Sequence, residues 1–115
     1  MLLLIPNFSI DVARSDAGVV VTVSGEVDIC TADWLGQELR RAQLLGVAVV
    51  VDLERVEFMD CCGLRVLLSA SADSSTASFA VTPGPRQVQK LFEITGAGAL
   101  LHITPVPVGL DRSAA

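Results

Sequence analysis

The run VAVVVDL at residues 47–53 constrains the fold more than any other part of this sequence. It is a continuous stretch of apolar, mostly β-branched residues, which is typical of a strand covered on both faces. Such strands occur at the centre of sheets that carry helices. Because helix-like periodicity precedes and follows the run, we predict an α/β domain with this strand in the middle of its sheet.

The N-terminal part alternates apolar and polar residues. The alternation covers two short stretches, separated by the turn-forming sequence SDAG at residues 15–18. Their apolar positions are Phe8, Ile10 and Val12, then Val19, Val21 and Val23. A period of two broken by a turn predicts a β-hairpin with one buried face.

Three later stretches have helical spacing. Their apolar stripes are Leu35, Leu39, Ala42 and Leu45; Leu64, Leu67 and Leu68; and Val88, Leu91 and Phe92. We expect Thr31 to be the N-cap of the first helix, Gly46 to end it, Pro85 to lie in the first turn of the third, and Gly96 to end the third. About three main helices therefore follow the hairpin.

Short apolar stretches at 78–82 and 100–103 predict two further strands. The polar residues 73–76 form a connection, and residues 105–115 form a loosely ordered tail. The resulting order is ββαβαβαβ. It predicts a mixed central sheet built from an N-terminal hairpin and strand-helix crossovers, within one domain of residues 1–115.

Composition excludes several classes of protein. The net charge is −5 and Lys and Arg form no run longer than Arg40–Arg41, which argues against nucleic-acid binding. The opening MLLLIP lacks the features of a signal peptide or membrane span, so we expect no membrane insertion. Three cysteines without a Cys-x-x-Cys spacing favour a reducing cytoplasm, with no metal site and no cofactor. The only histidine, His102, is expected to have a structural or surface role.

The junction Asp60-Cys61-Cys62-Gly63 is the most informative local feature. It lies where a strand pattern changes to a helix pattern, and free N–H groups at a helix N-terminus favour a phosphate or a thiolate. The cysteines are therefore either reactive thiols or small residues packed against the sheet. A disulfide between them would be strained, because adjacent Cα atoms lie about 3.8 Å apart and disulfides prefer about 4.4 Å or more.

Three blocks of the sequence carry a resemblance. They are VVVTVSGEVDICTADWL, VVVDLERVEFMDCCGLRVLL and QVQKLFEITGAGALLHI. In this order they resemble the STAS-domain anti-sigma factor antagonists of bacteria, whose motif reads Phe-Met-Asp-Ser-Ser-Gly-Leu. The resemblance spans residues 8–104. It implies a STAS-like single domain that is a binding protein and not an enzyme.

The resemblance also implies a partner and a site. Members of the family bind an anti-sigma factor, often a serine kinase, and so release a sigma factor. The kinase phosphorylates the first serine of the motif, which matches Cys61 here, and Cys62 matches its neighbour. By position, Asp28, Thr31, Asp60, Cys61 and Gly63 belong to the partner surface, and we add Arg65 to it. Trp34 lies on the flank of the first helix stripe, so it is either a further partner contact or a cover for the edge of the core.

The cysteine pair leaves three forms of regulation open. The antagonist could be constitutively active, or regulated by oxidation of Cys61 or Cys62 with Cys30 as a further thiol, or regulated at a hydroxyl such as Thr31 or Ser69. Two other functions are also open. One is a STAS subunit of a lipid-transport or other membrane-associated complex, and the other is a thiol-dependent enzyme or peroxide sensor built on Cys61.

Overall fold

A computed structural model describes residues 7–73 and 78–105 of the chain. The elements are β1 (Phe8–Ser15), β2 (Gly18–Val27), α1 (Ala32–Gln43), β3 (Val49–Met59), α2 (Cys61–Ala72), β4 (Phe79–Val81), α3 (Arg86–Thr95) and the 3-10 turn η1 (Ala97–Ala99). The predictions for the tail, the first six residues and most of the 73–76 connection lie outside the described residues.

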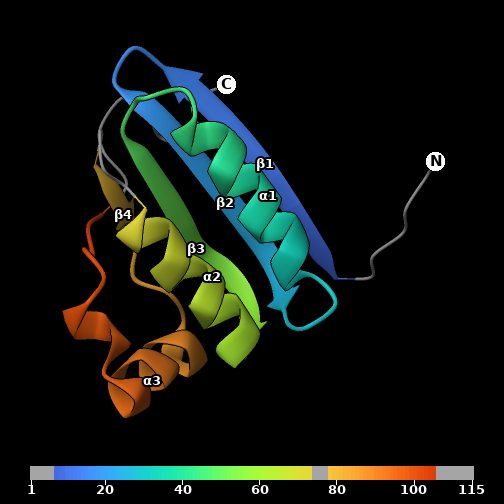
Figure 1. Ribbon diagram of the computed structural model, residues 1–115. Helices are drawn as coiled ribbons and strands as arrows, with labels where there is room; N and C mark the ends of the chain where they lie inside the picture. Colours follow the sequence, from blue (N-terminus) through green and yellow to red (C-terminus); the bar gives the residue numbers. More distant parts are fainter. Residues whose placement is uncertain (1–6, 74–77, 106–115) are drawn as a thin grey trace.

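The strands form one mixed sheet in the order β1-β2-β3-β4. β1 is antiparallel to β2, whereas β3 pairs in parallel with β2 on one side and with β4 on the other. Helices α1 and α2 lie side by side on one face of the sheet, and α3 lies near the end of β3 (Figure 1). The predicted α/β class, with its hairpin and its strand-helix crossovers, is confirmed.

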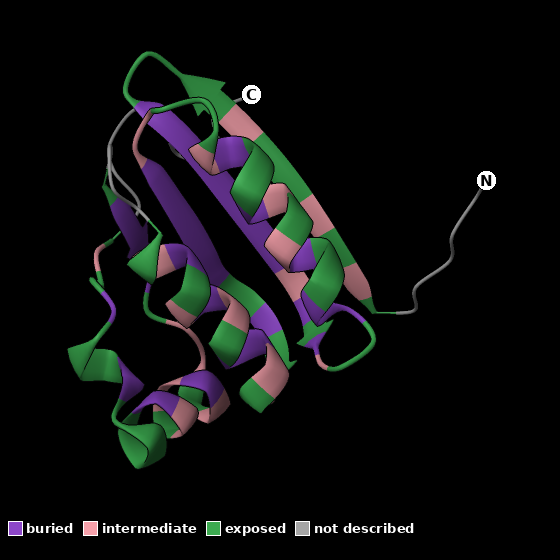
Figure 2. Ribbon diagram, viewed as in Figure 1, coloured by how far each residue is buried: buried purple, intermediate pink, exposed green. Residues whose placement is uncertain are grey.

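The main core lies between the sheet and these helices. Buried residues run along β2 and β3 and recur along the helices (Figure 2), and their side chains form one core cluster. They include Val19, Val21, Val23, Leu35, Leu39, Val49, Val51, Leu64, Leu67, Val88 and Phe92. The run at 47–53 is central as predicted, because β3 pairs with β2 on one side and with β4 on the other.

The hairpin prediction was wrong in one respect, because β2 is buried on both faces. Val19 and Val21 point into the main core, while Val20 is also fully buried and belongs to a second cluster with Val50 and Ala80. Alternation along β2 therefore does not separate a core face from a solvent face. The strand lies inside the sheet, between β1 and β3.

The predicted last strand is also corrected. Ile103 makes a single parallel bridge with Val81, flanked by hydrogen bonds from Val81 N–H to the His102 carbonyl and from Thr104 N–H to the Val81 carbonyl, each 2.9 Å. The turn η1 ends at Ala99, directly before the residues that the pattern placed in this strand. Gly96 ends α3 in the left-handed conformation as expected, at φ 75°.

The first helix ends earlier than its apolar stripe. α1 stops at Gln43, and Leu45 lies beyond it with 44% of its surface exposed. Among the described residues, no helix combines the length and the apolar character needed to cross a membrane.

Candidate functional site

The ends of β2 and β3 bring two distant segments of the chain together. Val27 and Met59 are register partners in the parallel pair, and the N–H of Asp60 donates to the Val27 carbonyl at 3.1 Å. The loop 28–31, which leads into α1, and the junction 60–63, which opens α2, therefore lie at the same edge of the sheet. This juxtaposition follows from the parallel pairing of β2 and β3.

Asp60 fixes the start of α2. Its backbone is extended, and its carboxylate accepts hydrogen bonds from the N–H groups of Cys62 (2.9 Å) and Gly63 (3.2 Å). This is the geometry of an acidic N-cap, which satisfies donors that have no partner within the helix. Cys61 and Cys62 follow as the first two helical residues.

All three cysteines are free thiols. Cys30 and Cys61 are exposed, and Cys62 is half-buried. The interpretation of the pair as packing residues therefore fails for Cys61, whose side chain faces solvent. A thiol exposed at the start of a helix is accessible to a partner, an oxidant or an alkylating reagent.

Gly63 is the point where α2 comes closest to the sheet. A methyl group built on it would lie 2.7 Å from Cγ1 of Val27 and 2.9 Å from Cγ of Met59. Because such distances are shorter than carbon–carbon contact, only glycine allows the helix to begin at this depth. Gly63 is buried, so it positions the helix without offering a surface to a partner.

Thr31 also has a different role from the one predicted. It occupies the N-cap position of α1, but its hydroxyl makes no capping hydrogen bond. The hydroxyl instead accepts from the N–H of Asp28 and donates to the Glu26 carbonyl, both at 2.9 Å, and the residue is 3% exposed. A buried hydroxyl that ties the loop to the end of β2 cannot form part of a partner surface directly.

The remaining predicted residues are accessible to different degrees. Cys30 and Arg65 are exposed, Trp34 is 42% exposed, and Asp28 is partly buried, with its carboxylate accepting from the N–H of Cys30 at 2.9 Å. Ile29 in the same loop is 76% exposed and was not predicted. Its exposure depends on how the loop turns, which no local pattern reveals.

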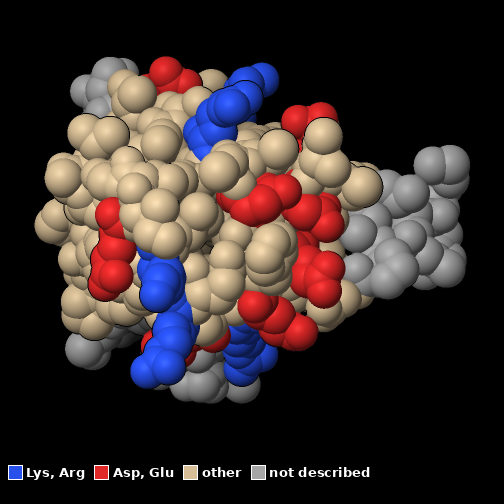
Figure 3. Space-filling model, turned by 90° about the horizontal axis from the view of Figure 1, so that it is seen from below, with Lys and Arg blue, Asp and Glu red and all other residues tan. Residues whose placement is uncertain are grey.

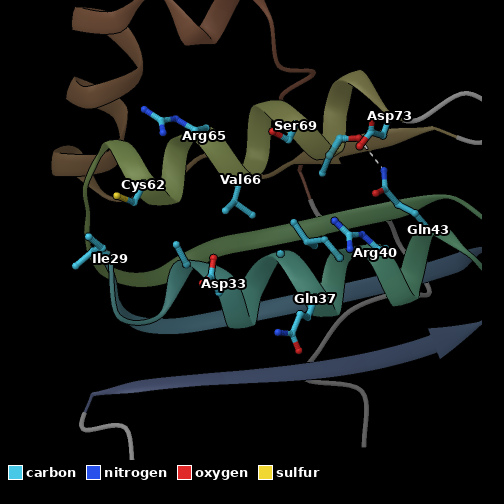
Figure 4. Close-up of a pocket in the computed structure, with 14 residues that line it drawn as sticks. Ile29, Asp33, Gln37, Arg40, Gln43, Cys62, Arg65, Val66, Ser69 and Asp73 are labelled. Carbon is cyan, nitrogen blue, oxygen red and sulfur yellow. Dashed lines mark hydrogen bonds between the residues drawn. The ribbon is translucent and has the colours of Figure 1, made fainter.

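A groove extends from this site between α1 and α2 (Figure 4). Its volume is about 520 Å³, and Ile29, Cys62 and Arg65 line one end. Trp34 does not line it. Trp34 and Cys62 therefore do not share a wall of this groove.

The end of the molecule that carries the site has an uneven charge distribution. Seen from below, most of the Asp and Glu side chains lie on one side, and the Lys and Arg side chains lie towards the margins, some of them next to acidic ones (Figure 3). Glu26 and Glu57 belong to the ends of β2 and β3, and both accept from the side-chain amide of Asn7, at 3.2 and 3.3 Å. Within the described ranges, no three His, Cys, Asp or Glu residues are grouped so as to hold a metal ion.

Gln87 of α3 belongs to the site and was missed in the sequence. Its side-chain amide donates to the Met59 carbonyl and accepts from the Met59 N–H, both at 2.9 Å. β4 pairs only with Val49–Val51 of β3, so Met59 at the end of β3 has no strand neighbour on that side. The Gln87 amide makes the two backbone hydrogen bonds that such a neighbour would make. No local signal could identify it, because its partner lies 28 residues away.

Removing this amide is expected to loosen the start of α2. Gln87→Ala leaves two backbone groups of the buried Met59 without their partners, which should lower the free energy of unfolding by about 1–3 kcal/mol. Hydrogen exchange at the amides of Cys62 and Gly63 should become faster. Gln87→Glu should show a similar loss at neutral pH, because a carboxylate cannot donate to the Met59 carbonyl.

The glutamate variant supplies a pH test. A protonated carboxyl group can donate a hydrogen bond to the Met59 carbonyl. The loss of unfolding free energy in Gln87→Glu should therefore become smaller as the pH falls towards about 4.3, the ordinary pKa of a glutamate side chain. Gln89→Ala is the control, because Gln89 accepts from the Gly84 N–H at 2.9 Å, outside the α2 junction. If Gln89→Ala speeds exchange at Cys62 and Gly63 as much as Gln87→Ala does, Gln87 has no special role there.

The chain is similar to known proteins over most of its length. A family model described as "Mlab, STAS domain" matches residues 10–102. The anti-sigma-B factor antagonist of Listeria monocytogenes is 30% identical over 107 residues, which cover 87% of this chain and 91% of that protein. The Staphylococcus aureus (strain NCTC 8325 / PS 47) protein of the same name is 28% identical over 100 residues, covering 84% and 93%.

A solved structure has a similar fold over most of the chain. The crystal structure of an anti-sigma factor antagonist from Mycobacterium paratuberculosis matches with a TM-score of 0.80 and 28% identity, covering 90% of this chain and 91% of that chain. The family match at 10–102 includes both the loop 28–31 and the start of α2. The site described above therefore lies within the matched region.

Proposed function

Because this chain belongs to the STAS domain family, we propose that it is an anti-sigma factor antagonist, which binds an anti-sigma factor and thereby releases a sigma factor. The observation that carries the proposal is the junction at Asp60–Gly63, which presents the exposed Cys61 beside the loop 28–31. The relatives named as antagonists support it. In this role the chain acts by binding, not by catalysis, and works in the cytoplasm.

The proposed contact surface consists of exposed side chains around this junction. Ile29 and Cys30 come from the loop before α1, and Cys61 and Arg65 come from the first turns of α2. Together they offer an apolar group, two thiols and one cation within a surface whose backbone is held by Asp60, Thr31 and Gln87. An exposed isoleucine and an arginine at one end of the same groove are suitable anchors for a protein partner.

We further propose that this antagonist lacks the serine phosphoswitch. A thiol at position 61 cannot become a phosphoserine. Thr31 is a poor substitute because its hydroxyl is buried and donates to the Glu26 carbonyl. Ser69 is exposed but lies two helical turns further along α2. These positions favour either constitutive activity or control through the thiols over control at another hydroxyl.

A thiol count combined with a binding assay tests the proposal and separates these two forms. Protein taken from cells before and after oxidant treatment is analysed by intact mass with thiol labelling, and its captured partners are identified under both conditions. Reversible loss of two thiols together with altered capture of an anti-sigma factor indicates a redox switch. Three free thiols and unchanged capture indicate an antagonist controlled by its abundance.

The same experiment contradicts the proposed function if no anti-sigma factor is captured in either state. Capture of membrane-transport subunits would favour the alternative, a STAS subunit of a lipid-transport or other membrane-associated complex. Whether the anti-sigma factor is a kinase follows from its sequence once it is captured. A Cys61→Ser variant then shows whether a hydroxyl at this position is phosphorylated by that partner.

A further inference from the structure

The outer face of α1 and α2 carries features that, apart from Arg65, the proposed contact with an anti-sigma factor does not use. We call it the α1–α2 face and define it by Asp33, Gly36, Arg40, Arg65, Ser69 and Asp73, all of which line the groove between the helices (Figure 4). The two helices run in the same direction, because each follows one of two parallel strands.

Four charges on this face have no partner in the described structure. Within residues 7–73 and 78–105 an ion pair joins Arg41 to Glu38, at 3.2 Å, and none involves these four side chains. Asp33 of α1 lies across the groove from Arg65 of α2, and Arg40 of α1 lies across from Asp73 at the end of α2 (Figure 4). The signs therefore alternate around the groove.

Gly36 lies between the charged positions of α1 and is not required by packing within the chain. A methyl group there would meet only Val66, at 3.7 and 3.9 Å, which is ordinary van der Waals contact. Its backbone is helical, and glycine within a helix is less favourable than alanine. A glycine that the fold does not need, on an exposed helix, is typical of a place where another backbone comes close.

We propose that the α1–α2 face binds a second copy of this chain, with the two α1 helices antiparallel across a twofold axis near Gly36. The midpoint of positions 33 and 40 falls beside Gly36, and the midpoint of 65 and 73 falls at Ser69. An axis through these points brings Asp33 opposite Arg40 of the other copy, and Arg65 opposite its Asp73. Each charge then meets one of opposite sign, and the glycines meet where the helices cross.

The charge pattern is what selects a second copy as the occupant. A twofold interface is self-complementary, so it needs a surface whose pattern matches itself after rotation. Antiparallel helices also oppose their macrodipoles favourably. Each copy carries a net charge of −5, which opposes association, so the dimer should form mainly at high protein concentration. Cys62 and Arg65 also belong to the candidate site, so the dimer covers part of it.

The test is the mass of the purified full chain, measured by sedimentation velocity from the micromolar to the millimolar range. We expect a monomer–dimer equilibrium. Arg40→Asp places a carboxylate opposite Asp33 of the other copy, twice in each dimer, and should raise the dissociation constant roughly tenfold or more. The double variant Asp33→Arg/Arg40→Asp restores opposite charges across the axis and should recover the dimer.

Two further variants protect the test against simple misfolding. Gly36→Leu should abolish the dimer while leaving the helix at least as stable, because leucine favours helix more than glycine does. Lys90→Asp makes the same change of charge on α3 and should leave the dimer unchanged. Circular dichroism and thermal melts show whether each variant is folded at the concentrations used.

Several results would overturn the proposal. One is a monomer at all concentrations, and another is a dimer whose dissociation constant is unchanged by Arg40→Asp or Gly36→Leu. A third is a dimer in Asp33→Arg/Arg65→Asp but not in Asp33→Arg/Arg40→Asp, because that result would require α1 of one copy to face α2 of the other. Because the chain is tested alone, failure here leaves the proposed binding of an anti-sigma factor unaffected, and failure of that function leaves this result intact.

Discussion

Cys61→Glu is expected to weaken binding of the captured anti-sigma factor about 10- to 100-fold, without loss of stability. The side chain at position 61 is exposed, so the added carboxylate faces the partner. It also lies four residues before Arg65, where it can form an ion pair along the helix and withdraw that cation from the interface. A change of this size corresponds to about 1.4–2.8 kcal/mol of binding energy.

Stability should respond in the opposite direction. A negative side chain in the first turn of a helix interacts favourably with the macrodipole, so the melting temperature of Cys61→Glu should be unchanged or slightly higher. Loss of binding therefore cannot be attributed to unfolding. The measurements are calorimetric titration with the captured anti-sigma factor and a thermal melt of the variant alone.

Two control variants make this result specific. Cys61→Ser keeps the size and neutrality of the side chain and should bind nearly as well as the wild type. Ala17→Glu adds the same charge in the exposed turn between β1 and β2, at the opposite end of the sheet, and should not affect binding. If Cys61→Glu binds as tightly as Ala17→Glu does, the interface lies elsewhere on the molecule.

Gly63→Ala should produce a clear loss of stability at the start of α2. The added carbon would overlap with the side chains of Val27 and Met59, at 2.7 and 2.9 Å, and both of these residues are fully buried. Overpacking of this kind costs about 1–3 kcal/mol. For a domain of this size the melting temperature should fall by about 5–15 °C.

Gly98→Ala is the matched control. Gly98 has nothing within 4 Å of an added methyl group and no positive φ, so the same change there should be neutral or slightly stabilising. A thermal melt of both variants checks the prediction. Equal melting temperatures for Gly63→Ala and Gly98→Ala would mean that α2 can move away from the sheet at little cost.

The displacement in Gly63→Ala should also reach the binding surface. α2 must shift outward to admit the methyl group, and Cys61 and Arg65 move with it, whereas the loop 28–31 stays tied to β2 through Thr31. We therefore expect weaker binding to accompany the lower stability. Cys61→Glu separates these two effects.

Much of the fold could be predicted from the sequence because its signals are local. The period of two in the first strands, the apolar run at 47–53 and the three helical stripes each depend on residues a few positions apart. The order of these elements then indicates a sheet with helical crossovers. The junction Asp60–Gly63 could be located for the same reason, since a strand pattern there changes directly to a helix pattern.

Properties that depend on distant residues could not be predicted in this way. The sequence alone does not reveal that Gln87 holds Met59, that Thr31 is buried, that β2 is covered on both faces or that Gly63 lies against Val27. Nor does it show that Asp33 and Arg40 of α1 line one groove with Arg65 and Asp73 of α2. Thus the sequence by itself determined the elements, their order and the thiol at the start of α2, because short-range periodicity and capping encode them. The tertiary structure alone decided which side chains are accessible and which are paired, because burial and hydrogen bonding arise only when segments far apart in the chain are packed together.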